Sequence, residues 1–212
     1  MKKICWVCLL ALGALNLNAR ADGQSDALLG KLRDKVRSFT SYKLDFTASV
    51  EDDGSARGSL VVSGRRFVAK VRGQELYYDG TTLWNYIPGQ QEVTIERLDP
   101  NNPSVLSNPS KLMNIDPKDY NHRTLPAFTT SKGKRLQVVE LTPKTATPDY
   151  SSLVLYIDPA TSLPERVSIA TPSSEQPVEL QLNNLQAGVP VTESTFRFDT
   201  KAHPGTEVID FR

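Results

Sequence analysis

The amino-acid sequence predicts a mainly β protein with helices, built as one curved or barrel-like antiparallel sheet with its helices held to one side. Three observations indicate this fold class. An amphipathic helical pattern occurs near the N-terminus, a long series of strand patterns follows it, and one proline-rich segment interrupts that series. Because no internal repeat is evident, one domain accounts for the pattern.

The first 21 residues have the features of a cleavable signal peptide. Lys2 and Lys3 supply a positive end, residues 4–17 form an apolar run, and Ala19-Arg20-Ala21 matches a cleavage site of the A-x-A form. The run is shorter than the roughly 20 residues of a membrane-spanning helix, so we expect no retained anchor. We expect export and a mature chain that comprises residues 22–212 as a single domain.

The composition of the expected mature chain narrows the function classes. Both cysteines, Cys5 and Cys8, lie in the signal peptide, so the mature chain has no thiol for a disulfide, a nucleophile or a metal site. The full sequence has 25 basic and 24 acidic residues, and the loss of Lys2, Lys3 and Arg20 leaves 22 basic residues against 24, a net charge of −2. This balance does not favour binding to nucleic acid or to an anionic membrane surface.

A helix is predicted for residues 25–39. Ser25 or Asp26 can cap its first backbone amides. Apolar residues recur along the segment at helical spacing and share one face, which we expect to pack against the sheet. These residues are Leu28, Leu29, Leu32, Val36 and Phe39.

Beyond Tyr42 the hydrophobic period changes to two, which is typical of half-buried strands. Turn residues separate the successive runs, most clearly at Asp52-Asp53-Gly54 and Asp79-Gly80. Strands are predicted at residues 44–50, 59–62 and 67–71, in both arms of a hairpin at 77–88, and at 91–98, 135–141, 152–157, 165–170, 178–182, 195–198 and 207–211.

Residues 99–117 interrupt the strand series and hold four of the fourteen prolines of the chain. Serines that follow or flank these prolines predict two short helices or helical turns joined by a loop. The apolar residues of the insertion are Val105, Leu106, Leu112 and Met113.

The hairpin at residues 77–88, YYDGTTLWNYIP, concentrates aromatic side chains. A two-residue turn and a four-residue turn around Asp79-Gly80 give different cross-strand partners, so the sequence leaves the register open. In both registers Trp84 and Tyr86 lie on the same face. Composition alone favours core packing of these side chains over a ligand-binding wall.

No arrangement of residues in the sequence predicts catalysis. His122 and His203 each lie beside a basic or turn residue, which predicts surface positions, and neither has a metal-ligand spacing to another histidine. The sequence contains no nucleophile elbow, phosphate-binding glycine loop or zinc-binding H-E-x-x-H motif. We therefore expect no catalytic residue, no metal and no cofactor, and keep a hydrolase as the less favoured reading. Arg65-Arg66 is either a solvated turn or a clamp for an anionic group or backbone.

Several stretches of the sequence resemble the LolA family of periplasmic lipoprotein carriers. Residues 79–88 match the family signature D-G-x-T-L-W-x-Y-x-P, and residues 141–144 match its L-T-P-K. Residues 195–210 resemble its closing F-x-F and G-V-x-V-x-D patterns, and Ser38-Phe39 followed by Phe46-Thr47 resembles its opening. The order and spacing agree across nearly the whole of the expected mature chain.

The resemblance implies an incomplete antiparallel β-barrel, or half-barrel, with an N-terminal amphipathic helix and a helical lid over a hydrophobic cavity. Residues 99–117 fall where the family keeps its lid helices. By this resemblance the cavity wall comprises Trp84, Tyr86, Tyr78, Leu83 and Phe46, and the lid comprises Val105, Leu106, Leu112 and Met113. The lid-locking arginine of the family lies in a K-R-P-x-x-F-type run; residues 63–67 lack the proline, and Arg65 is the corresponding residue.

The resemblance also implies a function. Carriers of this kind accept acylated lipoproteins from an inner-membrane ABC-type lipoprotein-releasing complex, cross the periplasm and deliver them to an outer-membrane acceptor, without a cofactor or a covalent step. The alternative is the same fold binding another lipid or amphiphile, or sensing acylated proteins, in an envelope regulatory or assembly role. The even charge pattern and the covered sheet predict a monomer.

Overall fold

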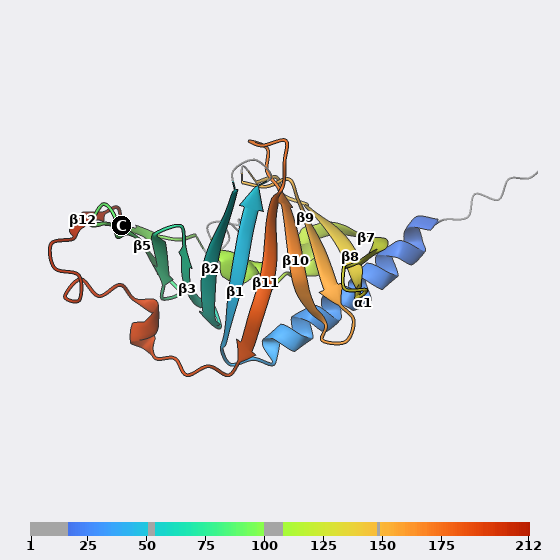
Figure 1. The fold of residues 1–212 in the computed structure, drawn as a ribbon, viewed down its shortest axis with the longest axis horizontal. Coiled ribbons are helices and arrows are strands. Elements are labelled where there is room, and N and C mark those ends of the chain that lie inside the picture. The colour runs from blue at the N-terminus through green and yellow to red at the C-terminus, as the bar shows by residue number, and fades with distance from the viewer. Residues whose placement is uncertain (1–16, 51–53, 100–107, 148) are drawn as a thin grey trace, which may run out of the picture.

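The computed structural model describes residues 17–50, 54–99, 108–147 and 149–212, and the fold is mainly β with one long helix (Figure 1). Helix α1 spans Leu17–Arg37, and short 3-10 helices are η1 (Pro109–Leu112), η2 (Pro117–Asp119) and η3 (Glu193–Phe196). The strands are β1 (Tyr42–Val50), β2 (Gly54–Ser63), β3 (Arg66–Val71), β4 (Gln74–Tyr78), β5 (Thr82–Ile87), β6 (Glu92–Arg97), β7 (Tyr120–Thr129), β8 (Arg135–Pro143), β9 (Ser152–Asp158), β10 (Leu163–Ala170), β11 (Val178–Ala187) and β12 (Glu207–Asp210).

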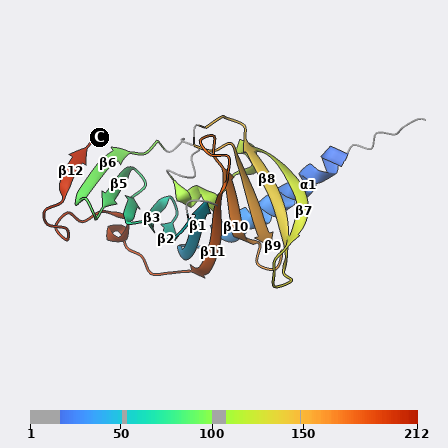
Figure 2. The ribbon, with the colours of Figure 1, turned by 45° about the horizontal axis from the view of Figure 1, so that its top comes forward.

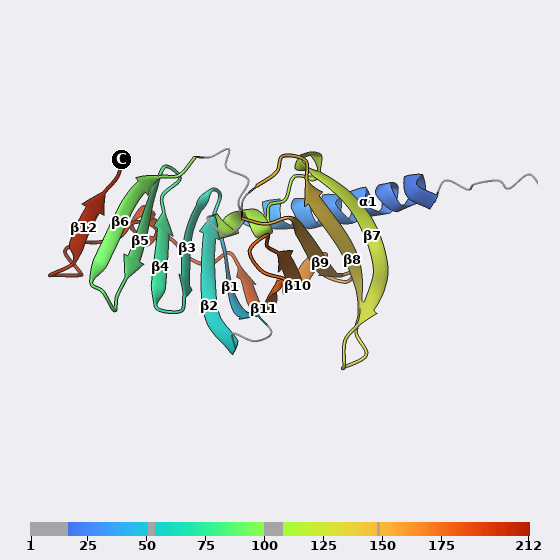
Figure 3. The same ribbon diagram turned by 90° about the horizontal axis from the view of Figure 1, so that it is seen from above.

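All twelve strands form one open sheet, in the order β12-β6-β5-β4-β3-β2-β1-β11-β10-β9-β8-β7. Neighbouring strands pair antiparallel, except that β12 lies parallel to β6. Viewed from above, the strands stand in one row from β12 to β7, and α1 lies along the β7–β10 end (Figure 3). The open antiparallel sheet confirms the predicted curved-sheet class.

Helix α1 packs its apolar face onto the β7–β10 end of the sheet, where it contacts β7 and β10 (Figure 2). Leu28, Leu29, Leu32 and Val36 are buried there, as their helical spacing predicts. The bounds differ from the predicted 25–39, because α1 begins at Leu17 and ends at Arg37. Phe39 lies beyond the helix and its ring contacts Tyr42, with the ring centroids 6.1 Å apart.

The two faces of the sheet bury separate hydrophobic clusters. The inner face, which faces α1 and η1, carries the main core, including the fully buried Phe67, Leu141 and Leu155. The outer face of β4–β6 carries a smaller cluster, in which Tyr77 and Trp84 pack against Tyr86, Val93 and Phe198. Because side chains alternate along a strand, each strand of this region contributes to both faces.

Three elements differ from the sequence prediction. Strand β7 was not predicted, and residues 195–198 form the end of η3 and an extended segment instead of a strand. Strand β2 begins at Gly54, five residues before the predicted start at residue 59. In the insertion, η1 lies at the helical turn predicted beside Ser110, whereas the turn predicted beside Ser104, with Val105 and Leu106, lies outside the described residues, and η2 begins only at the last residue of the insertion.

Candidate functional site: an apolar pocket on the inner face

The inner face of the sheet contains an apolar pocket of about 210 Å³ beside η1. Strands β1–β4, β10 and β11 form its floor and sides, and the segment around η1 lies over it. Every lining residue is apolar: Leu44, Phe46, Ala48, Leu60, Ala69, Val71, Leu76, Pro109, Leu112, Met113, Ile169, Val178, Leu180 and Leu182. The described part of the lining therefore offers no group for acid–base or nucleophilic chemistry, and it suits a hydrocarbon chain.

The pocket follows from the period-two pattern of the strands. On β1, Leu44, Phe46 and Ala48 point to the inner face and alternate with Asp45 and Thr47. Space remains because the small side chains of Ala48 and Ala69 occupy positions where larger residues would fill the core.

Helix η1 holds two apolar side chains over the pocket. Leu112 and Met113 are 7% and 1% exposed and belong to the main core. Pro109 occupies the first turn of η1, where its missing N–H costs no hydrogen bond. Asn108 precedes it, and its Oδ1 accepts a hydrogen bond from Ser110 Oγ at 2.5 Å. Two of the four predicted lid residues are thus at the pocket, and the other two lie outside the described residues.

Arg65 does not hold η1 by a direct bond. Its side chain is exposed, and no hydrogen bond or ion pair joins it to another residue in the described part of the chain. It lies close enough to affect Lys111 of η1: burial lowers the pKa of Lys111, and the Arg65 charge lowers it further, against the nearby Asp119 and Asp99. Arg66 instead packs its guanidinium over the Phe196 ring, 5.1 Å from the centroid.

The five residues of the predicted cavity wall do not come together. Tyr78 pairs with Leu83 and Tyr77 with Trp84, so the turn of the hairpin has four residues. Tyr78 and Leu83 face the inner core beside Phe67, with the Tyr78 and Phe67 ring centroids 5.3 Å apart. Trp84 and Tyr86 share one face, as predicted, but this is the outer face. Of the five, the apolar pocket is lined by Phe46 alone.

The outer aromatic cluster lies under the C-terminal segment, residues 188–206. The Phe198 ring packs against Tyr86, with centroids 4.7 Å apart, and against Tyr77 at 5.9 Å. His203 stacks on Phe198 at 4.7 Å and meets Tyr86 at 4.9 Å, so one face of its ring is covered, while the residue stays half-exposed at the surface as the sequence predicted. The aromatic residues of the hairpin are therefore divided between two cores.

His122 is the centre of a polar cluster between α1 and β7. Ser25 Oγ lies 2.8 Å from His122 Nδ1, and Asp26 Oδ1 lies 3.2 Å from His122 Nε2. The residue types are those of a hydrolytic triad. The Ser25 residue is, however, completely buried, and the His122 side chain is only 11% exposed, contrary to the predicted surface position. A substrate carbonyl cannot reach Ser25 Oγ, so the cluster attaches the helix to the strand.

In the parts of the chain that the structure describes, no group of three or more His, Cys, Asp or Glu side chains is placed to bind a metal. Among the same residues, no helix combines the length and the apolar character that crossing a membrane requires. The pocket-lining residues that sequence reasoning missed, chiefly Leu76, Val178, Leu180 and Leu182, are ordinary strand residues. Their inward alternation was visible in the sequence, but their convergence on one pocket depends on the order of the strands.

The fold has counterparts among solved structures. An uncharacterized conserved protein from Thermus thermophilus superposes with a TM-score of 0.59 at 11% identity, over 88% of this chain and 99% of that chain. A DUF1329 family protein from Desulfovibrio piger superposes with a TM-score of 0.51 at 14% identity, over 86% and 98% of the two chains. At these identities the likeness shows the fold alone.

A search of curated proteins finds no match to the sequence. A sequence profile of the family described as outer membrane lipoprotein carrier protein LolA matches residues 37–199, from the end of α1 to just beyond η3. The match includes the strands that form the apolar pocket and the whole of the insertion. The chain belongs to the LolA family.

Proposed function

We propose that this protein is a periplasmic carrier that binds the acyl chains of lipoproteins in the apolar pocket and moves them from the inner to the outer membrane. Membership of the LolA family supports the functional class. The observation that carries the proposal is the pocket itself, whose fourteen described lining residues are all apolar. Burying a methylene group contributes about 0.8 kcal/mol, so a short stretch of acyl chain in this pocket is held firmly without any polar contact.

Helix η1 is the lid of this proposal. Leu112 and Met113 cover the inner face, which keeps a large apolar patch from water. The pocket of about 210 Å³ has room for roughly seven groups the size of a water molecule, at about 30 Å³ each. A long acyl chain therefore requires that η1 move outward, and the flexible side chain of Met113 can repack as it does so.

The remaining steps of the transport route come from the family resemblance. The donor is an inner-membrane ABC-type lipoprotein-releasing complex and the recipient is an outer-membrane acceptor. Removal of the signal peptide after Ala21 would take away only the start of α1, since Leu28, Leu29, Leu32 and Val36 all lie beyond it. We propose that residues 22–212 are the working domain, with residues 99–117 as its lid insertion.

Native mass spectrometry tests the proposal directly. The protein is released gently from the periplasm of its host, and the masses of the free and loaded species are measured. We expect an acylated protein bound at one copy per chain, and N-terminal sequencing should start at Asp22. A protein recovered from the cytoplasm with its first 21 residues intact contradicts the proposed location.

A pocket-filling substitution tests the site. Ala48→Phe places a ring in the pocket without removing a core contact, so binding of an acylated peptide should weaken at least tenfold while stability changes little. Ala127→Phe, at an exposed position of β7, is the matched control and should leave binding unchanged. Equal affinity in the wild type and Ala48→Phe excludes the apolar pocket as the acyl site.

The small volume of the pocket favours one alternative, a carrier or sensor of a smaller amphiphile. A ligand that places about seven carbons in the pocket would fill it without displacing η1. Recovery of a free amphiphile in the mass spectrum, in place of an acylated protein, would decide for this alternative.

A further inference from the structure

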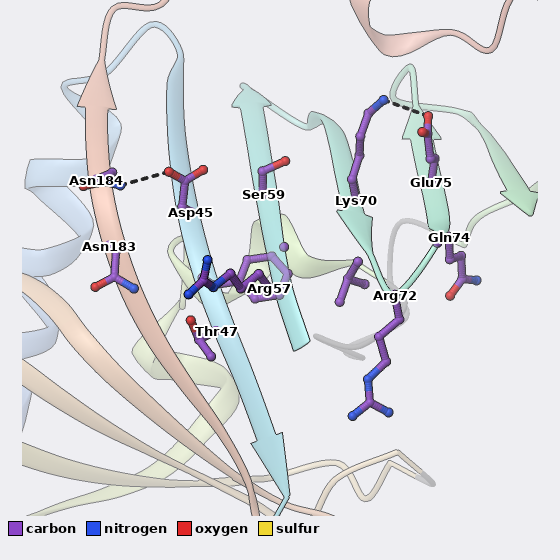
Figure 4. Close-up of a pocket in the computed structure, with 14 residues that line it drawn as sticks. Asp45, Thr47, Arg57, Ser59, Lys70, Arg72, Gln74, Glu75, Asn183 and Asn184 are labelled. Carbon is purple, nitrogen blue, oxygen red and sulfur yellow. Dashed lines mark hydrogen bonds and ion pairs between the residues drawn. The ribbon is translucent and has the colours of Figure 1, made fainter. Parts of the chain in front are cut away.

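The outer face of β1–β4 and β11 carries a polar groove of about 810 Å³, on the other side of the sheet from the apolar pocket (Figure 4). Its walls include residues that alternate with those of the pocket: Asp45, Thr47, Arg57, Ser59, Lys70, Arg72, Glu75, Asn183 and Asn184. Asn184 and Arg72 both have left-handed backbones, with φ values of 51° and 50°. Asn184 lies at the bulge of β11 opposite Leu44, and Arg72 lies in the β3–β4 turn.

The groove and the apolar pocket meet where the sheet has a step. Pairing of β2 with β3 ends at Gly58 and Val71, and the chain then turns back at Arg72-Gly73. Pairing of β1 with β2 runs on to Val50 and Gly54. Beyond Gly58, none of the described strands pairs with β2 on that side. Phe46 and Val71 lie at this step and line both the pocket and the groove.

Gly58 leaves space for an aromatic ring at the step. The Phe46 ring occupies the space of the missing side chain, since a Cβ on Gly58 would lie 2.3 Å from Phe46 Cζ. Phe46, whose ring lies beside Gly58, and Val71 are thus the two side chains that border both the inner pocket and the outer groove.

The charges of the groove are not balanced internally. Lys70 Nζ donates a hydrogen bond to Glu75 Oε2 at 2.8 Å, so these two charges neutralise each other (Figure 4). Asp45 accepts a hydrogen bond from Asn184 Nδ2 at 3.0 Å. Arg57 and Arg72 form no ion pair with any residue in the described ranges, which leaves two guanidinium groups against the single carboxylate of Asp45.

The two arginines extend in different directions from β2 and from the end of β3 (Figure 4). Arg57 extends across the strands toward Thr47, and Arg72 projects past the end of β3, whereas Asp45 lies toward β11 (Figure 4). A guanidinium group is suited to carboxylate and phosphate oxygens because it presents paired N–H donors in a plane. An apolar pocket and a groove with an excess of arginine that share Phe46 and Val71 match the two parts of one ligand.

We propose that the apolar pocket and the polar groove together bind a single-chain amphiphile with an anionic end group, a carboxylate or a phosphate monoester. The chain lies in the pocket, passes Phe46 at the step, and places its anionic group beside Arg57 and Arg72. The inference rests on the proposed acyl-binding function and adds a preferred end group, an exit for that group and the residues that receive it.

Calorimetric titration with ligands of one chain length tests this site. Decanoate and decyl phosphate carry the anionic group, decyl glucoside is the neutral counterpart, and acetate and inorganic phosphate lack the chain. We expect the protein purified from its host to bind the two charged amphiphiles about five- to tenfold more tightly than decyl glucoside at low salt, as exposed ion pairs allow. The preference should shrink at 0.5 M salt, roughly, because screening is then strong.

Two double variants separate the groove from general charge effects. Arg57→Gln with Arg72→Asn should remove the preference for the charged ligands and leave decyl glucoside affinity within about twofold. Asn is chosen at position 72 because it tolerates the left-handed backbone. Lys132→Gln with Arg135→Gln, at exposed positions in and beside β8, removes the same charge and should change none of the affinities.

The outcomes distinguish this inference from the proposed function. Equal affinity for the three amphiphiles, or an unchanged preference in the Arg57/Arg72 variant, overturns the inference and leaves acyl binding standing. Binding of acetate or inorganic phosphate as tight as that of the chain ligands also overturns it, because the groove is then a separate anion site. Failure of every amphiphile and of an acylated peptide to bind overturns both.

Discussion

Single residues decide how closely the strands of this sheet approach each other. Gly58 pairs with Phe46 across β1 and β2, and the ring lies where a side chain at position 58 would stand. A Cβ there would also come within 2.7 Å of the Lys70 carbonyl oxygen, which is backbone and cannot move aside cheaply. Gly30, in the middle of α1, has nothing within 4 Å of the corresponding position.

These two glycines should respond oppositely to the same substitution. Gly58→Ala should destabilise the protein by about 1–3 kcal/mol, because overpacking displaces Phe46 or the β3 backbone. Gly30→Ala should stabilise it by about 0.5–1 kcal/mol, because alanine restricts the unfolded chain and fits a helix. Urea denaturation measures both, and a neutral Gly58→Ala would contradict the close packing of the Phe46 ring.

Asp158 provides a residue-scale test by pH. Asp158 is only 4% exposed, and this burial by itself raises the pKa of its carboxyl group. Hydrogen bonds from Lys134 at 2.9 Å, from the Ala160 amide at 2.9 Å and from Thr161 at 3.2 Å favour the carboxylate and outweigh burial, so the pKa lies below its ordinary value. A lowered folded-state pKa stabilises the protein above the unfolded-state value and loses that contribution as pH falls.

We therefore expect the stability difference between the wild type and Asp158→Asn to shrink as pH falls below about 4, the ordinary value for an aspartate. Denaturation midpoints from neutral to acidic pH measure this difference, with Asp149→Asn, at a residue whose side chain takes part in no ion pair among the described residues, as the control. A difference that stays constant down to pH 2, roughly, would show that Asp158 has the same pKa in both states.

At the scale of elements, the sequence predicted which residues of the hairpin share a face but not their cross-strand partners. The two turn lengths shift the register by an even number of residues, so the residues on each face stay the same. In both cases Tyr78 and Leu83 share one face, and Tyr77, Trp84 and Tyr86 share the other; the structure has the four-residue turn. Asp79 selects the longer turn, since its Oδ1 accepts hydrogen bonds from the amides of Thr81 and Thr82 at 3.0 and 2.9 Å.

Elements that depend on distant partners could not be predicted. Strand β7 carries a bulge between Leu125 and Phe128 and contains Pro126, so its alternation is broken and its local pattern is weak. The assignment of Trp84 and Tyr86 to the outer face required Phe198, which comes from a segment more than 100 residues away. The five residues of the predicted cavity wall lie apart because a periodic pattern shows only which residues share a face of a strand. It does not show which other segments of the chain pack on each face.

The attachment of α1 to β7 gives an element-scale prediction. His122→Ala removes both polar contacts to the helix and leaves the buried hydroxyl of Ser25 without one partner, so stability should fall by about 1–3 kcal/mol. Hydrogen exchange should rise first in α1, while acyl affinity stays unchanged because the pocket lies elsewhere.

Asn121→Ala, the exposed neighbour on β7, is the matched control for this variant and should change neither property. Loss of acyl binding by His122→Ala in a protein that remains folded would contradict the purely structural role of the polar cluster.

At the scale of the whole molecule, one sheet supports two separate tasks. The inner face carries the main core and the apolar pocket, and the outer face of β4–β6 is closed by the C-terminal segment. That segment ends in β12, which pairs with β6 and ties the end of the chain to the far edge of the sheet. The pocket lies among β1–β4, β10 and β11, so it does not need the outer cluster as a wall.

This division predicts that stability and binding can be changed independently. Phe198→Ala removes the ring that Tyr86, Tyr77 and His203 contact, and Phe-to-Ala changes in a core cost about 3–5 kcal/mol. Trp84→Ala, on the same face, should also lower the denaturation midpoint. At a temperature where both variants remain folded, their acyl affinity should equal that of the wild type, in contrast to Ala48→Phe, which should keep its stability and lose binding. Weakened binding in folded Phe198→Ala would mean that the two faces are coupled through β4 and β5, because the pocket residue Leu76 and the outer residue Tyr77 are neighbours on the same strand.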